Sequence, residues 1–315
     1  MRYGYACISM QLSYPQKWGN QPKGIKPITT GRSMIRRTFD SKGHDYASEL
    51  TLANCRDLDT IMDWNVGQGY DFYRMTSGLA PWKSEYEWTD LKDLEDIKYH
   101  LESVGLKASI HDIRITCHPG PFNVLTSPHE HVVKNCVRDL SEHGDVFDFM
   151  GLSRTPYNKI NIHLGGAYGD KESAMERFCN NFELLPESVQ TRLTVENDDK
   201  ASMYSVKELY NGIYKRVGVP VVFDYHHHRF CSGGLTEQEA LELAMSTWPK
   251  EIIPVVHYSE SRSIEQEDEK IRPQAHSDYV YDYIDTYGNE VDVMIEAKHK
   301  ELAVRKYLEL HNERV

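Results

Sequence analysis

The feature that most constrains the fold is a regular alternation between short β-like runs and amphipathic helical stretches. The β-like runs are 3–9, 72–76, 113–117, 159–162, 192–195, 219–223, 252–256 and 291–295. The helical stretches are 52–66, 91–104, 127–143, 173–185, 205–217, 236–247 and 300–310. Eight strands alternating with helices predict an α/β fold, a single TIM-type (β/α)8 barrel, which needs about 250 residues.

No low-complexity linker divides the chain, so the prediction is one barrel domain over residues 1–315. The Gly- and Pro-containing stretch at about 14–44 is predicted to be a long loop insertion after the first strand. Its charged residues are almost all basic. They are Lys17, Lys23, Lys26, Arg32, Arg36, Arg37 and Lys42, against the single acid Asp40. From the residues alone, a solvated loop and a phosphate contact are equally good interpretations.

Composition restricts the class of protein and the cellular compartment that are expected. Hydrophobic residues make up 40% of the chain, but no run of eighteen apolar residues occurs, so no membrane span or membrane partner is expected. The segment 1–8 reads as a strand and not as a secretion signal. The six cysteines are scattered without a CxxC pair, which favours a reduced, cytoplasmic protein without a zinc–cysteine site. The net charge of −12 argues against nucleic-acid binding only if charge is evenly spread.

Metal-ligand residue types follow strand after strand. In (β/α)8 barrels the catalytic residues lie at the carboxyl ends of the strands. Here the strands from the third to the eighth end on histidine or a carboxylate, and one more histidine lies in the loop before the eighth strand. The candidate ligands are His118, His163, Glu196, Asp224, His227, His257, His276 and Glu296.

Converging charged groups need compensating cations, and bound divalent metals supply them. Imidazole and carboxylate ligands without thiolate suit manganese, zinc or iron better than magnesium or calcium. Eight ligands exceed the need of one ion, so two or three ions are predicted, with Glu196 as the bridging and catalytic carboxylate. Of the adjacent histidines 226–228, strand alternation favours His227.

A polynuclear centre of this kind suits hydrolysis of a phosphodiester. The metals would lower the pKa of a bound water and neutralise phosphate charge. The sequence contains no Gly-rich nucleotide loop, so no nucleotide cofactor is expected.

With these residues in view, the chain resembles the UV damage endonuclease family over nearly its whole length. The matching segments are 4–7, 63–65, 72–77, 118–119, 122–125, 162–165, 196–199, 224–228, 257–259, 276–279 and 296–298. The resemblance implies a barrel with up to three metal ions, usually manganese, held by the eight ligands named above. It also implies a monomer that acts on damaged double-stranded DNA. Such enzymes nick on the 5′ side of cyclobutane dimers, 6-4 photoproducts and abasic sites, leaving a 3′-hydroxyl.

The resemblance further implies residues that contact DNA. A Gln–Tyr pair that the family inserts into the duplex corresponds here to Pro121 and Phe122, and a proline–aromatic wedge is physically reasonable. The alternative is a loop packed on itself. Tyr5 and Ser9 match lesion-contacting positions, although Ser9 replaces the usual asparagine.

The backbone contacts would come from the basic loop, through Lys17, Arg32, Arg36 and Arg37. Lys298, two residues after Glu296, is a candidate catalytic residue that would neutralise phosphate charge; a surface ion pair is the alternative. Val255 is a departure, because some members carry a carboxylated lysine there that helps to hold the metals.

Three other functions fit parts of the pattern. An abasic-site endonuclease with three zinc ions also uses a set of histidine and carboxylate ligands on a barrel. A sugar isomerase or epimerase uses two metals on the same barrel, but it needs neither a basic loop nor an aromatic wedge. A catalytically silent protein that binds damaged DNA is the third alternative, raised by the loss of lysine at Val255.

Overall fold

The structure is a computed structural model that describes residues 1–311, and its centre is a closed barrel of eight parallel strands in sequence order. The strands are β1 (Tyr3–Ala6), β2 (Phe72–Met75), β3 (Arg114–Cys117), β4 (Ile160–His163), β5 (Leu193–Glu196), β6 (Val221–Asp224), β7 (Val255–Tyr258) and β8 (Asp292–Ile295). Closure comes from pairing of β1 with β8, in which Tyr3 lies opposite Val293 and Gly4 opposite Met294. The predicted TIM-type barrel is confirmed. The end of the predicted domain, at residues 312–315, lies outside the described residues.

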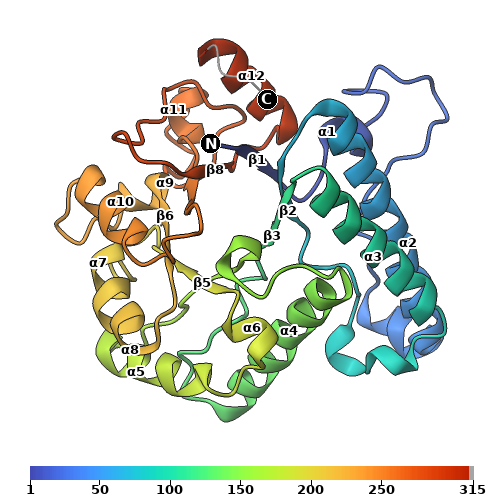
Figure 1. Cartoon of the computed structure of the whole chain (residues 1–315), viewed down its shortest axis with the longest axis horizontal. Coiled ribbons are helices and arrows are strands. Elements are labelled where there is room, and N and C mark those ends of the chain that lie inside the picture. Colours follow the sequence, from blue (N-terminus) through green and yellow to red (C-terminus); the bar gives the residue numbers. More distant parts are fainter. Residues whose placement is uncertain (312–315) are drawn as a thin grey trace.

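Helices surround the barrel (Figure 1). They are α1 (Met10–Ser13), α2 (Arg36–Gln68), α3 (Leu94–Ile110), α4 (Glu130–Phe149), α5 (Lys171–Phe182), α6 (Glu187–Gln190), α7 (Val206–Leu209), α8 (Lys215–Val217), α9 (Tyr225–His228), α10 (Glu237–Met245), α11 (Arg262–Glu265) and α12 (Glu301–His311). Short 3-10 helices lie at Lys83–Glu85, Trp88–Asp90 and Pro156–Asn158, and a π-helical turn at Tyr210–Tyr214 joins α7 to α8. Among the described residues, none of the helices has the length and apolar character needed to cross a membrane.

Local chemistry sets several element boundaries. Helix α10 begins with a capping box, in which the Thr236 hydroxyl accepts from the Glu239 amide and the Glu239 carboxylate accepts from the Thr236 amide. The last two strands of the barrel begin later than hydrophobicity alone predicts. Pro254 lacks an amide proton for the ladder, so β7 starts at Val255, three residues after the predicted start.

The predicted basic insertion at 14–44 is only partly a loop, because helix α2 already begins at Arg36. The helix is kinked at Gly43, whose φ of 64° and ψ of −157° interrupt the helical geometry. Before the kink, Phe39 is buried against Trp82, with ring centroids 5.9 Å apart. Because Gly43 interrupts the helix, the helical residues before it were not predicted from the sequence. The irregular segment therefore ends near residue 35 and not at residue 44.

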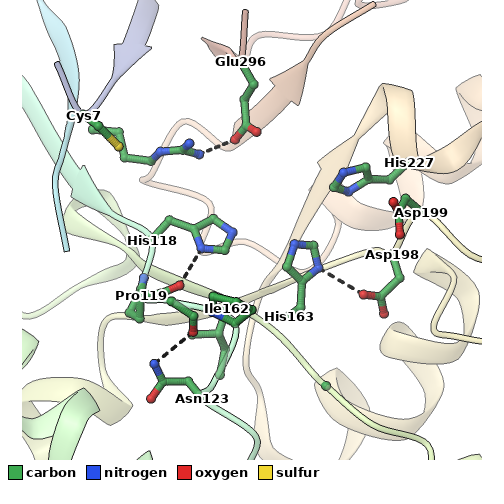
Figure 2. Close-up of a pocket in the computed structure, with 14 residues that line it drawn as sticks. Cys7, His118, Pro119, Asn123, Ile162, His163, Asp198, Asp199, His227 and Glu296 are labelled. Atoms are coloured by element: carbon green, nitrogen blue, oxygen red, sulfur yellow. Dashed lines mark hydrogen bonds and ion pairs between the residues drawn. The ribbon is translucent and has the colours of Figure 1, made fainter. Parts of the chain in front are cut away.

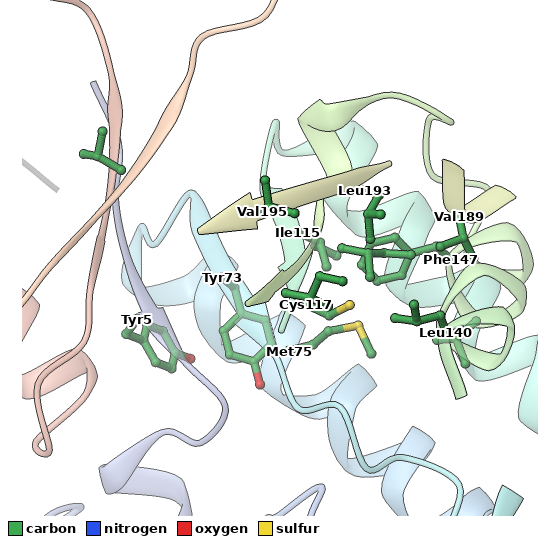
Figure 3. Close-up of a cluster of buried hydrophobic side chains, with 14 of the residues drawn as sticks. Tyr5, Tyr73, Met75, Ile115, Cys117, Leu140, Phe147, Val189, Leu193 and Val195 are labelled. Atoms are coloured by element: carbon green, nitrogen blue, oxygen red, sulfur yellow. The ribbon is translucent and has the colours of Figure 1, made fainter. Parts of the chain in front are cut away.

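Buried side chains hold the helices on the outside of the barrel, and a second, smaller apolar cluster lies beside them. Figure 3 shows part of the large cluster, where Ile115 and Leu193 of the strands lie beside Phe147 and Leu140 of α4. The smaller cluster is formed by Ala6, Phe72, Val222, Trp248, Val255 and Met294. A methyl group at Gly4 would lie 2.7 Å from the Phe72 ring, so only glycine fits there.

A buried ion pair closes the amino-terminal end of the barrel. The Arg114 guanidinium lies 2.9 Å from the Asp292 carboxylate, and both side chains are almost completely buried. Arg114 also donates to the carbonyl oxygen of Ile253 at 2.7 Å. The pair therefore ties β3 to β8 from inside, at the end opposite to the candidate ligands.

We expect the substitution Asp292→Asn to lower the free energy of unfolding by about 3–5 kcal/mol, because it leaves the buried Arg114 charge without a counter-charge. Urea denaturation would measure the change. The matched control is Asp112→Asn, which removes an exposed partner of Arg2 and should cost less than about 1 kcal/mol. Equal effects of the two substitutions would contradict the structural role assigned to Asp292.

Candidate metal centre

Glu196, the last residue of β5, is a buried carboxylate surrounded by four histidines. Its Oε1 atom lies 3.2 Å from His227 Nδ1 and 3.9 Å from His163 Nε2. Its Oε2 atom lies 3.0 Å from His257 Nδ1 and 3.4 Å from His118 Nε2. Four separate strand ends therefore deliver a ring nitrogen to one carboxylate.

Two groups of ligand atoms share this carboxylate. One consists of His118, His163 and Glu196, and the other of Glu196, Asp224 and His257; within each group the ligand atoms lie within 4.8 Å of one another. A carboxylate common to two such groups is placed as a bridging ligand would be.

The last two predicted ligands lie on the β8 side of the same cluster. Glu296 Oε1 lies 3.1 Å from His257 Nδ1. His276 reaches the cluster from the long loop between β7 and β8, where it forms an isolated bridge with Ser261. Its Nδ1 atom lies 2.8 Å from the carbonyl oxygen of Glu296, which leaves Nε2 as its ligand atom. All eight predicted ligands are thus gathered at the carboxyl end of the barrel.

The turn after β6 selects one of the three adjacent histidines. Asp224 caps the short helix α9, and its Oδ1 atom accepts from the His227 amide at 2.8 Å. This cap turns His227 toward Glu196. His226 packs edge-on against Phe230, and His228 lies against Phe223, so both are buried away from the cavity.

The cluster opens into a cavity of about 510 Å³. Figure 2 shows His118, His163, His227 and Glu296 around this space, together with Cys7 and the loop that carries Pro119. The remaining residues in contact with the cavity are Arg74, Gly120, Pro121, Asn123, Ile162, Gly165, Asp198 and Asp199. An open cavity over buried ligands gives a large substrate access to any bound ion.

The protonation states fit a cation site. Burial alone would raise the pKa of Glu196, but His257 and His163 lower it well below its ordinary value, so the carboxylate is charged. Burial lowers the pKa of His118 to about 4, so its imidazole is neutral and able to bind a metal. Burial opposes protonation of His163, yet Glu196 and Asp198 raise its pKa to about 9. The surroundings of Glu196 therefore favour positive charge.

One ligand atom also lacks a hydrogen-bond partner. Asp224 Oδ2 is buried without such a partner among the described residues. An unpaired buried carboxylate oxygen is costly, and a cation is the group that would satisfy it. The residues present therefore fit a metal centre with nitrogen and oxygen ligands.

Several residues that orient these ligands were not predicted from the sequence. Asn161 donates from Nδ2 to Glu196 Oε2, and the Thr194 hydroxyl donates to Asn161 Oδ1 at 2.8 Å. Asp198 Oδ1 lies 3.2 Å from His163 Nδ1 and fixes that ring. The period of two along a strand could have found Asn161, which lies two residues before His163 on the same face.

Val255 occupies the position at which a carboxylated lysine would have helped to hold the metals. Val255 belongs to the smaller apolar cluster, together with Trp248 and Met294. Lys159, immediately before β4, places its Nζ atom 3.0 Å from His257 Nε2. Burial lowers the pKa of Lys159 to about 7. A lysine therefore does touch a candidate ligand, but from another strand.

Two predicted lesion contacts have other roles in this structure. Tyr5 is fully buried, and its hydroxyl donates to Asn65 Oδ1 at 2.6 Å. Ser9 is also fully buried, and its hydroxyl donates to Glu301 Oε1 at 3.0 Å. Both side chains are already enclosed by protein, so neither is available for a direct contact with DNA.

The loop between β3 and α4 exposes its aromatic residue. Phe122 is 86% exposed, and Pro121 lines the cavity beside His118. A loop packed on itself would have covered the Phe122 ring, so the structure does not support that alternative. Insertion into DNA stays a prediction.

The predicted phosphate contacts divide into free and engaged side chains. Arg32 donates to Asp57 Oδ2 at 2.7 Å and to the Thr29 carbonyl oxygen at 2.6 Å, so it fastens the loop to α2 and is not free for DNA. Arg36 pairs with two acids, Asp40 at 2.8 Å and Glu85 at 3.0 Å.

The other predicted cations are exposed. Lys17 and Arg37 are exposed, and the Lys17 ammonium lies 4.8 Å from the centre of the Trp18 ring. Lys298 is exposed and does not line the cavity, which is inconsistent with the catalytic role predicted for it.

The barrel and the gathered ligands define a TIM-barrel enzyme with a candidate centre for more than one metal ion. A family model described as UV-endonuclease UvdE matches residues 1–314, and the chain belongs to this endonuclease family. The predicted resemblance is thereby confirmed.

Individual relatives agree with this assignment. A protein of Bacillus cereus (strain Q1) named UV DNA damage endonuclease is 30% identical over 98% of this chain and 93% of its own length. A UV-damage endonuclease of Schizosaccharomyces pombe is 34% identical over 99% of this chain but 51% of its own length. The crystal structure of SacUVDE superposes with a TM-score of 0.80 and 28% identity, and the match covers 100% of both chains.

A xylose isomerase domain protein from Planctomyces limnophilus has a TM-score of 0.53 at 13% identity, over 80% of this chain and 90% of its own. At that level of identity the likeness shows a shared fold and carries no argument for sugar chemistry.

We expect Glu196→Gln to reduce the number of bound Mn²⁺ ions more than Asp224→Asn does, because Glu196 belongs to both ligand groups and Asp224 to one. Elemental analysis after equilibrium dialysis would count the ions, with circular dichroism as a control for folding. Equal losses in the two variants would contradict a bridging role for Glu196.

Proposed function

We propose that the chain is a metal-dependent DNA repair endonuclease that nicks double-stranded DNA immediately 5′ to UV photoproducts. Cyclobutane dimers and 6-4 photoproducts are the proposed substrates, and abasic sites are a further one. The observation that carries the proposal is the buried Glu196 carboxylate shared by two ligand groups below an open cavity. Relatives of nearly the same length that are named UV DNA damage endonuclease support the choice of substrate.

The proposed cofactor is Mn²⁺, as two or three ions, with Zn²⁺ or Mg²⁺ as alternatives. The ligands would be His118, His163, Glu196, Asp224, His227, His257, His276 and Glu296. Bound divalent cations supply Lewis-acid chemistry, which neutralises phosphate charge and favours ionisation of water. The chain itself holds the geometry, because Asn161 fixes Glu196, and Asp198 fixes His163.

The proposed DNA contacts lie around the cavity. Phe122 is exposed on the loop whose Pro121 lines the cavity; it would enter the base stack at the lesion, with Pro121 as the second part of the wedge. Exposed Lys17 and Arg37 would contact the phosphate backbone. We further propose that one copy of the chain is enough for incision and that the enzyme works in the cytoplasm. All eight ligands are contributed by a single chain, which supports the first of these points.

We expect the purified protein to nick an end-labelled, UV-irradiated duplex in the presence of Mn²⁺. Chelation, or the substitution Glu196→Gln, should slow nicking by at least about 1000-fold, since several kcal/mol of transition-state stabilisation depends on the ions. A sequencing gel would locate the nick relative to the lesion. Matched abasic and undamaged duplexes complete the panel, and equal nicking of undamaged duplex would refute lesion specificity. Rapid nicking of abasic duplex alone would favour the abasic-site endonuclease.

We expect Phe122→Ala to weaken binding to the irradiated duplex by about 10- to 100-fold, because stacking of a base on an aromatic ring contributes about 1–3 kcal/mol. Fluorescence anisotropy with labelled duplexes would measure the affinity. Tyr99→Ala is the matched control, since Tyr99 is also an exposed aromatic residue but lies on α3 and not on the loop between β3 and α4. An affinity unchanged by Phe122→Ala would exclude the wedge.

A further inference from the structure

The cavity has two chemically different sides. The candidate metal ligands come from β3 to β8 and the loops after them. The side formed by β1 and β2 contributes Cys7 and Arg74 to the cavity wall instead. Arg74 lies in β2, within the matching segment 72–77, but it was not among the residues predicted to bind metal or DNA.

Arg74 is held at the edge of the metal centre. Its Nη1 atom donates to Glu296 Oε1, the pair marked by the dashed line to Glu296 in Figure 2. Both side chains are only 11% exposed. The same Glu296 oxygen lies 3.1 Å from His257 Nδ1, so one carboxylate oxygen serves both the guanidinium and the ligand cluster.

The guanidinium is incompletely satisfied. Arg74 Nε is buried and has no hydrogen-bond partner among the described residues. A buried arginine that serves only as a structural tie uses its donors more fully. Arg114 shows this at the other end of the barrel, where its Nε, Nη1 and Nη2 atoms all donate to protein oxygens. Among the described residues, Arg74 donates to protein only through Nη1, and its side chain lines the cavity, so Nη2 is the donor left for a ligand there.

The surroundings favour an anion as the missing partner. Lys300, which follows β8, is partly buried, and burial together with the nearby Arg74 charge lowers its pKa. Lys300 therefore adds positive charge near Arg74, although only Arg74 lines the cavity. A planar guanidinium with several donors matches the oxygens of a phosphate group better than any other side chain does.

We propose that Arg74 is the phosphate-binding residue of the cavity, which contacts non-bridging oxygens of the DNA strand beside the metal centre. The inference rests on the proposed function, because it takes the substrate to be a phosphodiester. Arg74 has the role that the sequence assigned to Lys298, whose side chain lies outside the cavity. Glu296 holds the guanidinium in place at the edge of the cavity.

The test measures two kinds of binding without DNA. Inorganic phosphate is titrated against the Mn²⁺-loaded protein, and binding is followed by broadening of the phosphorus-31 resonance. Mn²⁺ stoichiometry is measured on the same samples. We expect Arg74→Met to weaken phosphate binding by about 10- to 100-fold, as for lost hydrogen bonds to a charged group, while the Mn²⁺ stoichiometry stays the same. Lys298→Met is the matched control and should change neither quantity.

Three results would overturn the proposal. The first is failure of the wild-type protein to bind phosphate, and the second is a phosphate affinity that Arg74→Met leaves unchanged. Loss of Mn²⁺ in Arg74→Met is the third result, because it would show that Arg74 only supports Glu296. If Arg74→Met fails to fold, Arg74→Lys carries the test, because it keeps the charge but loses the planar donors. Its phosphate affinity should fall about 10-fold, and an unchanged value would overturn the proposal.

Failure of the phosphate site and failure of the proposed function can be distinguished. A wild-type protein that binds phosphate and Mn²⁺ through Arg74 as expected, yet does not nick irradiated duplex, would refute the endonuclease and leave the phosphate site standing.

Discussion

The structure depends on a single constraint, which is that a charged carboxylate is buried at the centre of a protein. Glu196 can stay ionised there only because four imidazoles and the Asn161 amide surround it. Each of these groups comes from a strand end or the turn after it, so the barrel acts as the frame that brings them together. The arrangement also offers nitrogen and oxygen atoms that could hold a cation, with Glu196 common to both groups of ligand atoms.

Charged residues inside the barrel fall into two groups: those that stabilise the fold lie at the amino-terminal end, and those of the candidate site lie at the carboxyl end. At the amino-terminal end, Arg114 and Asp292 form a buried pair in which all three guanidinium nitrogens of Arg114 donate to protein oxygens. At the carboxyl end, Glu296 is shared between Arg74 and His257, and Asp224 keeps an unpaired oxygen. Between the two ends lies Lys159, which contacts His257 from within the barrel. Charge that stabilises the fold is thus fully paired, whereas charge at the site remains open to ligands.

The fold and the gathering of the ligands could be predicted from the sequence for one physical reason. Parallel strands in a closed barrel end on the same side, so residues at strand ends such as His163 and Glu196 must meet even though they are distant in sequence. The same rule carries no information about residues within a strand, such as Arg74, or before it, such as Lys159. Their inward orientation depends on register, and the strand boundaries were uncertain by up to three residues.

Surface contacts were harder to predict than the centre. Tyr5 and Arg32 belong to residue types that often bind DNA, yet one is enclosed by Asn65 and its aromatic neighbours, and the other is held by Asp57. Whether a side chain is exposed depends on partners that come from elsewhere in the chain, and the sequence pattern does not identify them. Phe122 is the reverse case, in which the loop leaves an apolar ring in solvent.

The way in which β1 pairs with β8 has a consequence for assembly of the protein during synthesis. His118 and Glu296 are separated by more than half of the chain, and Glu296 follows the strand whose pairing with β1 closes the barrel. A nascent chain therefore holds an incomplete set of ligands until its last strand has left the ribosome and docked. Metal uptake is in this way tied to the final non-local step of folding, so a truncated or misassembled chain would lack the means to cut DNA.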